Sequence, residues 1–198
     1  MSRVVAILVA VVLVSVGGCG VKRHTVSARP STARPVLLEF YWLKDIQSSN
    51  NPVGQWRMEM MPGNAKGYLF TNPKGKTIDS LAEPQKVMDQ VVRAKQNPPV
   101  LTGRDLLPNA EANVNPRNLV VINIEFNKRG TKVFREFTRR HVGDYLAVFC
   151  DGKLLTAPSI NEAIPSGKAE ITGFTNLAEA RRMADGINAS ASGVTPGP

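Results

Sequence analysis

The chain has 198 residues, which is enough for one hydrophobic core. It holds 25 Lys and Arg residues against 16 Asp and Glu residues, a formal net charge of +9. A charge of this size is typical of proteins that bind nucleic acid or an anionic surface. There are only two cysteines and two histidines. This count excludes a disulfide-dense scaffold, and the two scattered histidines could form a zinc site only with the help of carboxylates.

The first 18 residues are typical of a bacterial lipoprotein signal peptide. Arg3 supplies a positive charge, and the apolar run at 4–14 is shorter than the roughly 20 residues that a membrane-spanning helix needs. The Val-Gly-Gly sequence before Cys19 resembles a lipobox, which predicts lipidation of Cys19 after cleavage. The alternatives are an uncleaved signal anchor and an ordinary signal peptide with an incidental cysteine.

Residues 19–35 are predicted to be the lipidated cysteine and a flexible basic tether. The tether would hold the rest of the chain on the extracytoplasmic, periplasmic side of a bacterial membrane. Its cations either attract anionic lipid headgroups or keep the spacer solvated. Because the chain is expected to be exported, we expect no nucleic-acid partner.

Residues 36–99 are expected to form an N-terminal α+β segment that packs onto the rest of the chain. The apolar run Val36–Leu43 predicts a mostly buried strand. Met58 and Met60 alternate with charged residues, as in a half-buried strand. They belong either to an ordinary core or to an adaptable peptide-binding surface, so they are candidate partner-binding residues. A helix is expected over 84–95, with a proline in its first turn.

The stretch 119–143 has the pattern of a strand followed by an amphipathic helix. A β-branched run at 119–126 predicts the strand. Asn127 is suited to cap the start of the helix, and Gly143 is suited to end it. The apolar stripe of this helix is predicted to contain Val133, Phe134, Phe137 and His141.

The next stretch predicts a hairpin. A strand is expected at 145–150, and Asp151-Gly152 is typical of a type I′ turn. The returning segment 153–164 contains Pro158, which indicates an edge or bent strand. Residues 169–174 are expected to add a last strand.

Two similar stretches, 101–106 and 171–177, each predict a strand that turns into a helix through a glycine with positive φ. Asp105 or Asn176 would cap the helix that follows. After the last helix, residues 189–198 are small and polar and are expected to form a disordered tail.

The motifs at 100–188 are similar to those of the first periplasmic (P1) head domain of the bacterial protein-export membrane protein SecD. The matching residues include Leu101, Thr102, Gly103, Arg104, Asp105, Leu106, Glu125, Phe126, Asn127, Gly130, Phe134, Thr138, Gly143, Asp151, Gly152, Lys153, Ala157, Pro158, Ile160, Asn161, Glu162, Ile171, Thr172, Gly173 and Phe174. This resemblance implies an α+β fold with a small mixed or antiparallel sheet and helices packed on one face. In that family the domain meets exported polypeptide and moves as protons flow through a transmembrane bundle. We expect no such bundle here, and hence no proton-driven work.

Four cations, Lys128, Lys132, Arg135 and Arg139, are predicted to share one face of the helix after Asn127. They form either a solvated face or a contact for an anionic membrane or an acidic polypeptide. These four are therefore candidate partner-binding residues.

The residues suited to catalysis are few. No GxSxG, P-loop or HExxH motif occurs. Cys150 ends an apolar strand, so we expect a buried thiol, and His141 is expected to pack within the helix stripe. Glu125, Asp151 and Glu162 are carboxylates whose convergence the sequence does not predict. We expect a protein that is not an enzyme and has no cofactor and no metal.

Two functions remain. The first is a lipoprotein that binds polypeptide, or a translocon or envelope partner, in protein export. The second is a structural or sensory envelope lipoprotein that reuses the fold. An exposed apolar groove beside an unpaired strand edge would favour peptide capture, and a fully polar surface would favour the structural role.

Overall fold

The structure is a computed structural model that describes residues 33–46, 55–62, 67–93 and 97–193. The predicted signal peptide, Cys19 and most of the tether lie outside these residues. The strands are β1 Leu38–Trp42, β2 Arg57–Met60, β3 Tyr68–Thr71, β4 Thr77–Asp79, β5 Leu101–Thr102, β6 Glu111–Val114, β7 Val120–Glu125, β8 Leu146–Cys150, β9 Lys153–Thr156 and β10 Lys168–Ile171. The helical elements are α1 Pro84–Lys86, the π-helical η1 Val87–Val92, the 3-10 turn η2 Gly103–Asp105, α2 Lys128–Arg140 and α3 Leu177–Ala191.

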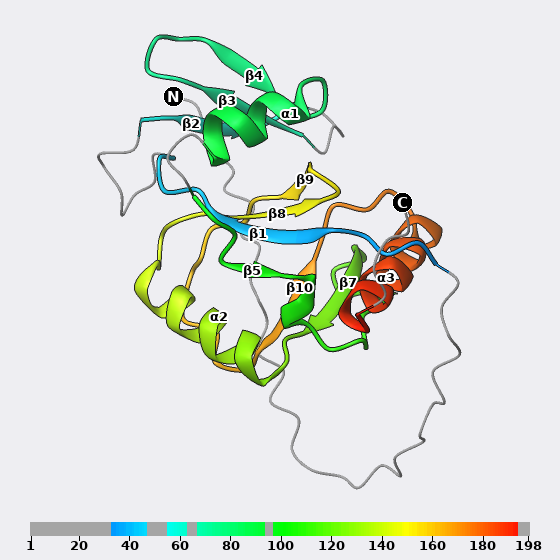
Figure 1. The fold of residues 1–198 in the computed structure, drawn as a ribbon. Coiled ribbons are helices and arrows are strands. Elements are labelled where there is room, and N and C mark those ends of the chain that lie inside the picture. The colour runs from blue at the N-terminus through cyan, green and yellow to red at the C-terminus, as the bar shows by residue number, and fades with distance from the viewer. Residues whose placement is uncertain (1–32, 47–54, 63–66, 94–96, 194–198) are drawn as a thin grey trace, which may run out of the picture.

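An antiparallel sheet with the strand order β5-β1-β8-β9 lies at the centre of the molecule (Figure 1). All five residues of β8 are buried, because the sheet is covered on both faces. Successive side chains of a strand point to opposite faces. Leu146, Val148 and Cys150 therefore enter one core, while Ala147 and Phe149 enter a second core.

The first core lies between the central sheet, helices α2 and α3, and a second antiparallel sheet with the order β10-β7-β6. Helix α3 packs against β6 and β7, and in Figure 1 it lies on the opposite side of the molecule from α2. Gly186 of α3 also accepts a backbone hydrogen bond from the amide of Val36 at 3.3 Å. The beginning and the end of the described chain therefore lie side by side.

The second core lies on the other face of the central sheet. A third antiparallel sheet, β2-β3-β4, and the α1–η1 helix cover that face. Residues 87–92 supply four buried side chains, Val87, Met88, Val91 and Val92. Thus the helix predicted over 84–95 is confirmed, and it ends near residue 92 with a π-helical segment.

The α+β class with antiparallel sheets is confirmed. The helices divide between the two faces of the central sheet, since α1–η1 packs into the second core and α2 and α3 into the first. The central sheet contains strands from both sides of the boundary expected at residue 99, because β1 pairs with both β5 and β8. Residues 38–42 are thus an inner strand of the main sheet rather than part of a segment packed onto it.

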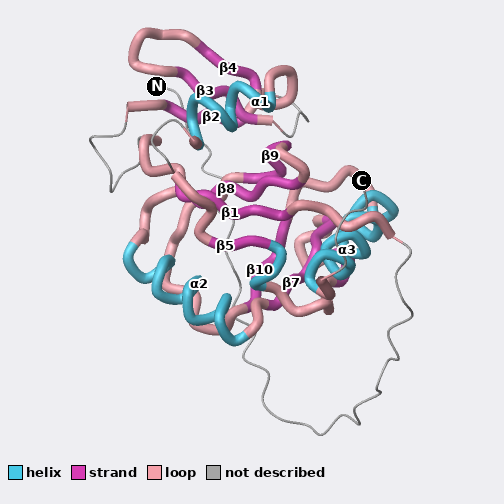
Figure 2. The backbone as a smooth tube through the Cα atoms, in the orientation of Figure 1, coloured by secondary structure: helices cyan, strands magenta, loops and turns pink. Residues whose placement is uncertain are grey.

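Several local predictions are confirmed by backbone geometry. The side chain of Asn127 accepts a hydrogen bond from the amide of Gly130 at 2.9 Å, and Asn176 caps α3 in the same way. Asp151 and Gly152 both have positive φ, as a type I′ turn requires. The returning strand is shorter than the expected segment 153–164, because β9 ends at Thr156. Residues 157–167 form the loop that Figure 2 shows between the hairpin and β10.

Two local predictions are wrong. Gly103 does not have positive φ, whereas Gly173 does, with φ of 110°. Asp105 does not begin a helix; it closes a 3-10 turn in which Thr102 is the capping residue. In addition, α3 continues to Ala191, past the expected start of the tail at residue 189, because Asn188 and Ala189 pack against the rest of the chain.

Candidate binding groove along helix α2

The N-terminus of α2 is held against the η2 turn by backbone contacts. The amide of Asn127 donates to the carbonyl of Asp105 at 2.8 Å, and its side-chain amide donates to the carbonyl of Arg104 at 2.9 Å. Gly130 lies directly against this turn, where an added Cβ would stand 2.4 Å from the Asp105 carbonyl oxygen. Two matching stretches of the resemblance, 101–106 and 125–130, therefore form one structural joint.

The Asp105 carboxylate completes this joint. Its side chain is buried, and it accepts a hydrogen bond from the amide of Thr102 at 2.9 Å. It also forms an ion pair with Arg129 of α2. A buried carboxylate requires such partners, because an unpaired buried charge is strongly unfavourable. Asp105 thus fixes the position of α2 rather than offering a free acid.

The C-terminal half of α2 is fixed by Thr138 and His141. The fully buried Thr138 hydroxyl donates to the Phe134 carbonyl and accepts from the amide of Ile164, both at 2.9 Å. The ring of His141 stacks on Phe137, with centroids 4.4 Å apart, and its Nδ1 lies 3.0 Å from Asp144. His141 is therefore a packed residue at the end of the helix, as the sequence predicted.

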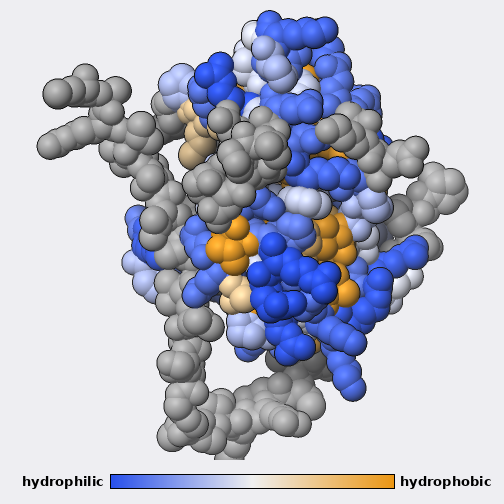
Figure 3. All heavy atoms as spheres, turned by 90° about the vertical axis from the view of Figure 1, so that its left-hand side faces the viewer, coloured by the Kyte–Doolittle hydropathy of each residue, from blue (hydrophilic) through white to orange (hydrophobic). Residues whose placement is uncertain are grey.

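An open groove of about 830 Å³ runs along α2. Its apolar part is formed by Val133 and Phe137 of the helix and by Val100, which precedes β5. Its remaining lining is polar and mostly cationic: Lys128, Arg129, Lys132, Glu136, Arg140 and His141. Figure 3 views the molecule from the side on which α2 lies, and hydrophobic residues there adjoin strongly hydrophilic ones.

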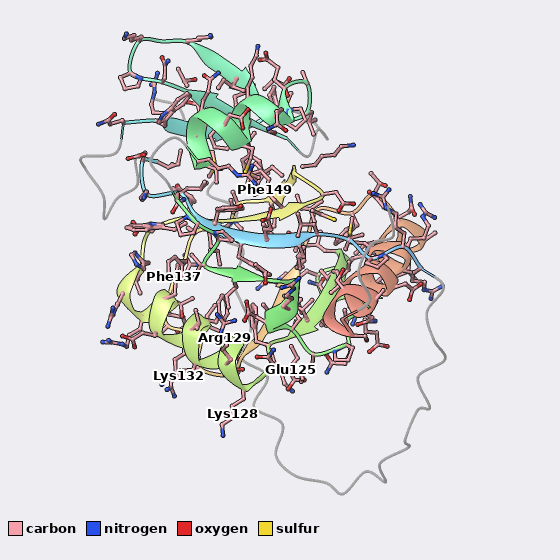
Figure 4. The ribbon with its side chains drawn as sticks, in the orientation of Figure 1. Glu125, Lys128, Arg129, Lys132, Phe137 and Phe149 are labelled. Atoms are coloured by element: carbon pink, nitrogen blue, oxygen red, sulfur yellow. The ribbon has the colours of Figure 1, made fainter. Side chains whose placement is uncertain are left out.

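The cations of the groove are not neutralised by its one acid. Glu136 is engaged by two guanidinium groups, those of Arg139 at 2.9 Å and Arg140 at 2.6 Å. The hydrogen bond from Arg139 lowers the pKa of Glu136, so this carboxylate is ionised at neutral pH. Figure 4 shows Lys128 and Lys132 pointing away from the sheets. The groove therefore combines an apolar strip with a positive border.

The four predicted cations are all exposed on α2, whereas the two methionines lie elsewhere. Met58 is half-buried and packs against the second core, opposite Phe70. Met60 is 63% exposed on β2, at one end of the β2-β3-β4 sheet. The structure thus separates the methionines from the α2 cations, on opposite faces of the central sheet. The role of all six in binding a partner stays a prediction.

Sequence reasoning missed the apolar lining and part of the positive border. Val133 and Phe137 were expected to be core residues, but both are only partly buried. Arg129 and Arg140 have no special local pattern. Val100 joins the groove only because β5 pairs with β1. The one available signal was the spacing of Val133 and Phe137 on a helix flank.

Among the candidate catalytic residues, Cys150, Asp151 and Glu125 have structural contacts, whereas Glu162 is exposed. Cys150 is buried, and this burial raises the pKa of its thiol to about 12. A thiol that stays protonated is a poor nucleophile. Asp151 accepts from the amide of Leu37 at 2.8 Å, and Glu125 accepts from the side chain of Asn109 at 3.2 Å. Among the residues that the structure describes, no cluster of His, Cys, Asp and Glu is suited to a metal ion.

The fold and the groove together define an α+β domain of three antiparallel sheets, with a cationic helix at its surface. Residues 79–191 match the family model described as the SecDF P1 head subdomain. This match covers more than half of the chain, and the chain belongs to that family. It begins before residue 100, where the motif resemblance started, and so includes the α1–η1 helix. In the described part of the chain, no helix has the length and apolarity needed to cross a membrane.

Relatives and solved structures agree with this assignment. The chain is 41% identical over 85 residues to the protein translocase subunit SecD of Acidaminococcus fermentans. This stretch covers 43% of this chain and 20% of that protein. It is 39% identical over 87 residues to the protein translocase subunit SecDF of Thermus thermophilus. This stretch covers 44% of this chain and 12% of that protein. The chain thus spans a fifth or less of the length of these two relatives.

Two solved structures of SecDF share the fold. One, of a membrane component SecDF that enhances protein export, has a TM-score of 0.52 and 24% identity, covering 79% of this chain and 64% of that one. The other, of SecDF in its super-membrane-facing form, has a TM-score of 0.54 and 24% identity. The match covers 79% of this chain and 19% of that one.

Proposed function

We propose that this protein is a non-catalytic lipoprotein, anchored through Cys19 on the extracytoplasmic side of a bacterial membrane. Its SecD head-like domain binds a polypeptide, or a translocon or envelope partner, in protein export. The observation that carries this proposal is the α2 groove in a domain of the SecDF P1 head family. A fully polar surface would instead have favoured the structural or sensory alternative.

The groove suits a short extended polypeptide segment. Its volume of about 830 Å³ falls within the usual range for ligand sites, roughly 300–1,000 Å³. The strip of Val100, Val133 and Phe137 can contact apolar side chains, and the cations beside it can pair with carboxylates. A segment with both apolar and acidic residues therefore satisfies both parts of the groove.

Support for the anchor comes from the sequence, in the apolar run and the Val-Gly-Gly-Cys motif. The described chain begins at residue 33, and Arg34 already lies against α3. Its carbonyl oxygen is so close to Gly186 that a Cβ added there would stand 3.0 Å from it. A cysteine that carries several acyl chains holds a protein stably at a membrane, since one chain gives only marginal binding. Replacing Cys19 with Ser should therefore release the protein from the membrane fraction of cells.

Site-specific photocrosslinking in cells tests the binding site. A probe replaces Lys132 at the groove, Met60 on β2, or Lys74 in the exposed β3–β4 turn, which is the control. We expect crosslinks to exported chains or translocon subunits from Lys132 and none from Lys74. Crosslinks from Met60 alone would move the site to the β2 edge. Equal labelling from all three positions, or none, would contradict a role in export.

A further inference from the structure

Helix α2 carries a straight row of cations on its outermost face. Lys128, Lys132, Arg135 and Arg139 lie within about 60° of one another around the helix, and along about 16 Å of its axis. All four side chains are exposed. The buried residues of α2, Gly130, Phe134 and Thr138, lie on average about 130° around the helix from the row. The row therefore faces solvent rather than the body of the domain.

This row keeps most of its charge. No acid among the described residues pairs with Lys128, Lys132 or Arg135. Arg139 shares Glu136 with Arg140, so these three side chains together still carry one positive charge. Exposed like charges along one helix face repel one another and lower helix stability slightly. A neighbouring anionic surface would remove that cost.

We propose that this outer row of α2 docks the domain on an anionic phospholipid bilayer. The row contains no apolar side chain, so it fits a plane of phosphate groups better than a peptide, whose apolar side chains would need the groove on the helix flank. A cation near an anionic membrane strengthens binding by about fivefold, and the four together by on the order of several hundredfold.

The length of the tether allows this contact. The inference rests on the proposed anchor at Cys19, from which residues 20–33 can reach about 46 Å when fully extended. Tether and row are both basic, so they are attracted to the same anionic leaflet. With the row on the membrane, the α2 groove on the flank of the helix would open along the membrane surface.

Lysine footprinting of the full chain tests the docking. The protein is reconstituted into vesicles of phosphatidylcholine alone, or of phosphatidylcholine with 30% phosphatidylglycerol, and is treated briefly with an acetylating reagent. Mass spectrometry then compares modification of Lys128 and Lys132 with that of Lys74 and Lys76, the exposed reference lysines of the β3–β4 turn. We expect at least fivefold protection of the α2 lysines in the anionic vesicles only, and its loss at high salt.

A pair of charge-matched variants provides a second measurement. The row variant K128Q/K132Q/R135Q/R139Q and the control R57Q/K74Q/K76Q/R181Q each remove four exposed cations. Both variants also carry Cys19→Ser, so that no acyl anchor holds them on the vesicle. In vesicle sedimentation, the gain in binding from phosphatidylglycerol should then fall at least about a hundredfold for the row variant. It should change much less for the control.

Three results would overturn the inference. One is equal modification of all four lysines in anionic vesicles, and another is an equal loss of binding in the two variants. The third is protection by polyglutamate but not by phosphatidylglycerol, which would assign the row to an acidic polypeptide. A chain that does not stay with neutral vesicles would contradict the anchor instead. Crosslinking from Arg140, which lines the groove but lies outside the row, reports separately on polypeptide binding.

Discussion

Replacement of Gly130 by Ala has two effects of opposite sign on the free energy of unfolding. In an exposed helix, Ala is more favourable than Gly by about 1 kcal/mol. At position 130, however, the new Cβ would stand 2.4 Å from the Asp105 carbonyl oxygen and 3.0 Å from its Cβ. The η2 turn must retreat by at least about 0.6 Å to relieve this contact.

That retreat acts on several hydrogen bonds at once. The amide of Asn127 donates to the same Asp105 carbonyl, and the Asp105 carboxylate accepts from Thr102. Each bond contributes about 1 kcal/mol, and overpacking costs typically 1–3 kcal/mol. After the gain in helix propensity, we expect G130A to lower the free energy of unfolding by about 2 kcal/mol.

Urea denaturation followed by circular dichroism measures this change. The matched control is Lys132→Ala, an exposed site on the same helix, where we expect a change within about 0.5 kcal/mol. If G130A proved as stable as the native chain, or more stable, helix propensity would dominate. The close approach of α2 to the η2 turn would then not hold the helix in place.

Two further predictions concern buried groups. Thr138→Val keeps the shape but leaves the amide of Ile164 without its acceptor, so we expect a loss of about 1–3 kcal/mol; no loss in urea denaturation would refute this role. The Cys150 thiol has a folded pKa of about 12, above the unfolded value of about 8.5. Between these two pKa values, the unfolded state binds fewer protons than the folded state. The free energy of unfolding therefore falls with rising pH, by up to about 1.4 kcal/mol per pH unit. Cys150→Ala should therefore show a flatter decline between pH 8.5 and 10.5 in the same assay, and parallel curves would contradict the buried thiol.

Features that depend on adjacent residues could be predicted from the sequence. The caps at Asn127 and Asn176 each need only one side chain and an amide three residues further along. The Asp151-Gly152 turn needs two neighbouring residues that tolerate positive φ. For Gly103, the same local reasoning fails, because Thr102 and Asp105 stabilise a 3-10 turn that needs no positive φ.

Features that depend on distant pairing could not be predicted. The apolar run at 36–43 indicated a buried strand, but nothing local indicates that β1 lies between β5 and β8, which are 60 and more residues away. The groove has the same origin. Val100 lines the groove together with Phe137 only because β5 pairs with β1. Thus the cations of α2 were identified from helical spacing, and the apolar strip beside them was not.

The two ends of the described chain run next to each other. The amide of Val36 donates to the carbonyl of Gly186, and the hydroxyl of Ser190 donates to the carbonyl of Val36. A domain whose chain enters and leaves at one place can be inserted into a loop of a larger protein without separating the flanking segments. The same unit is therefore suited both to a tether at one end and to insertion within a much longer polypeptide.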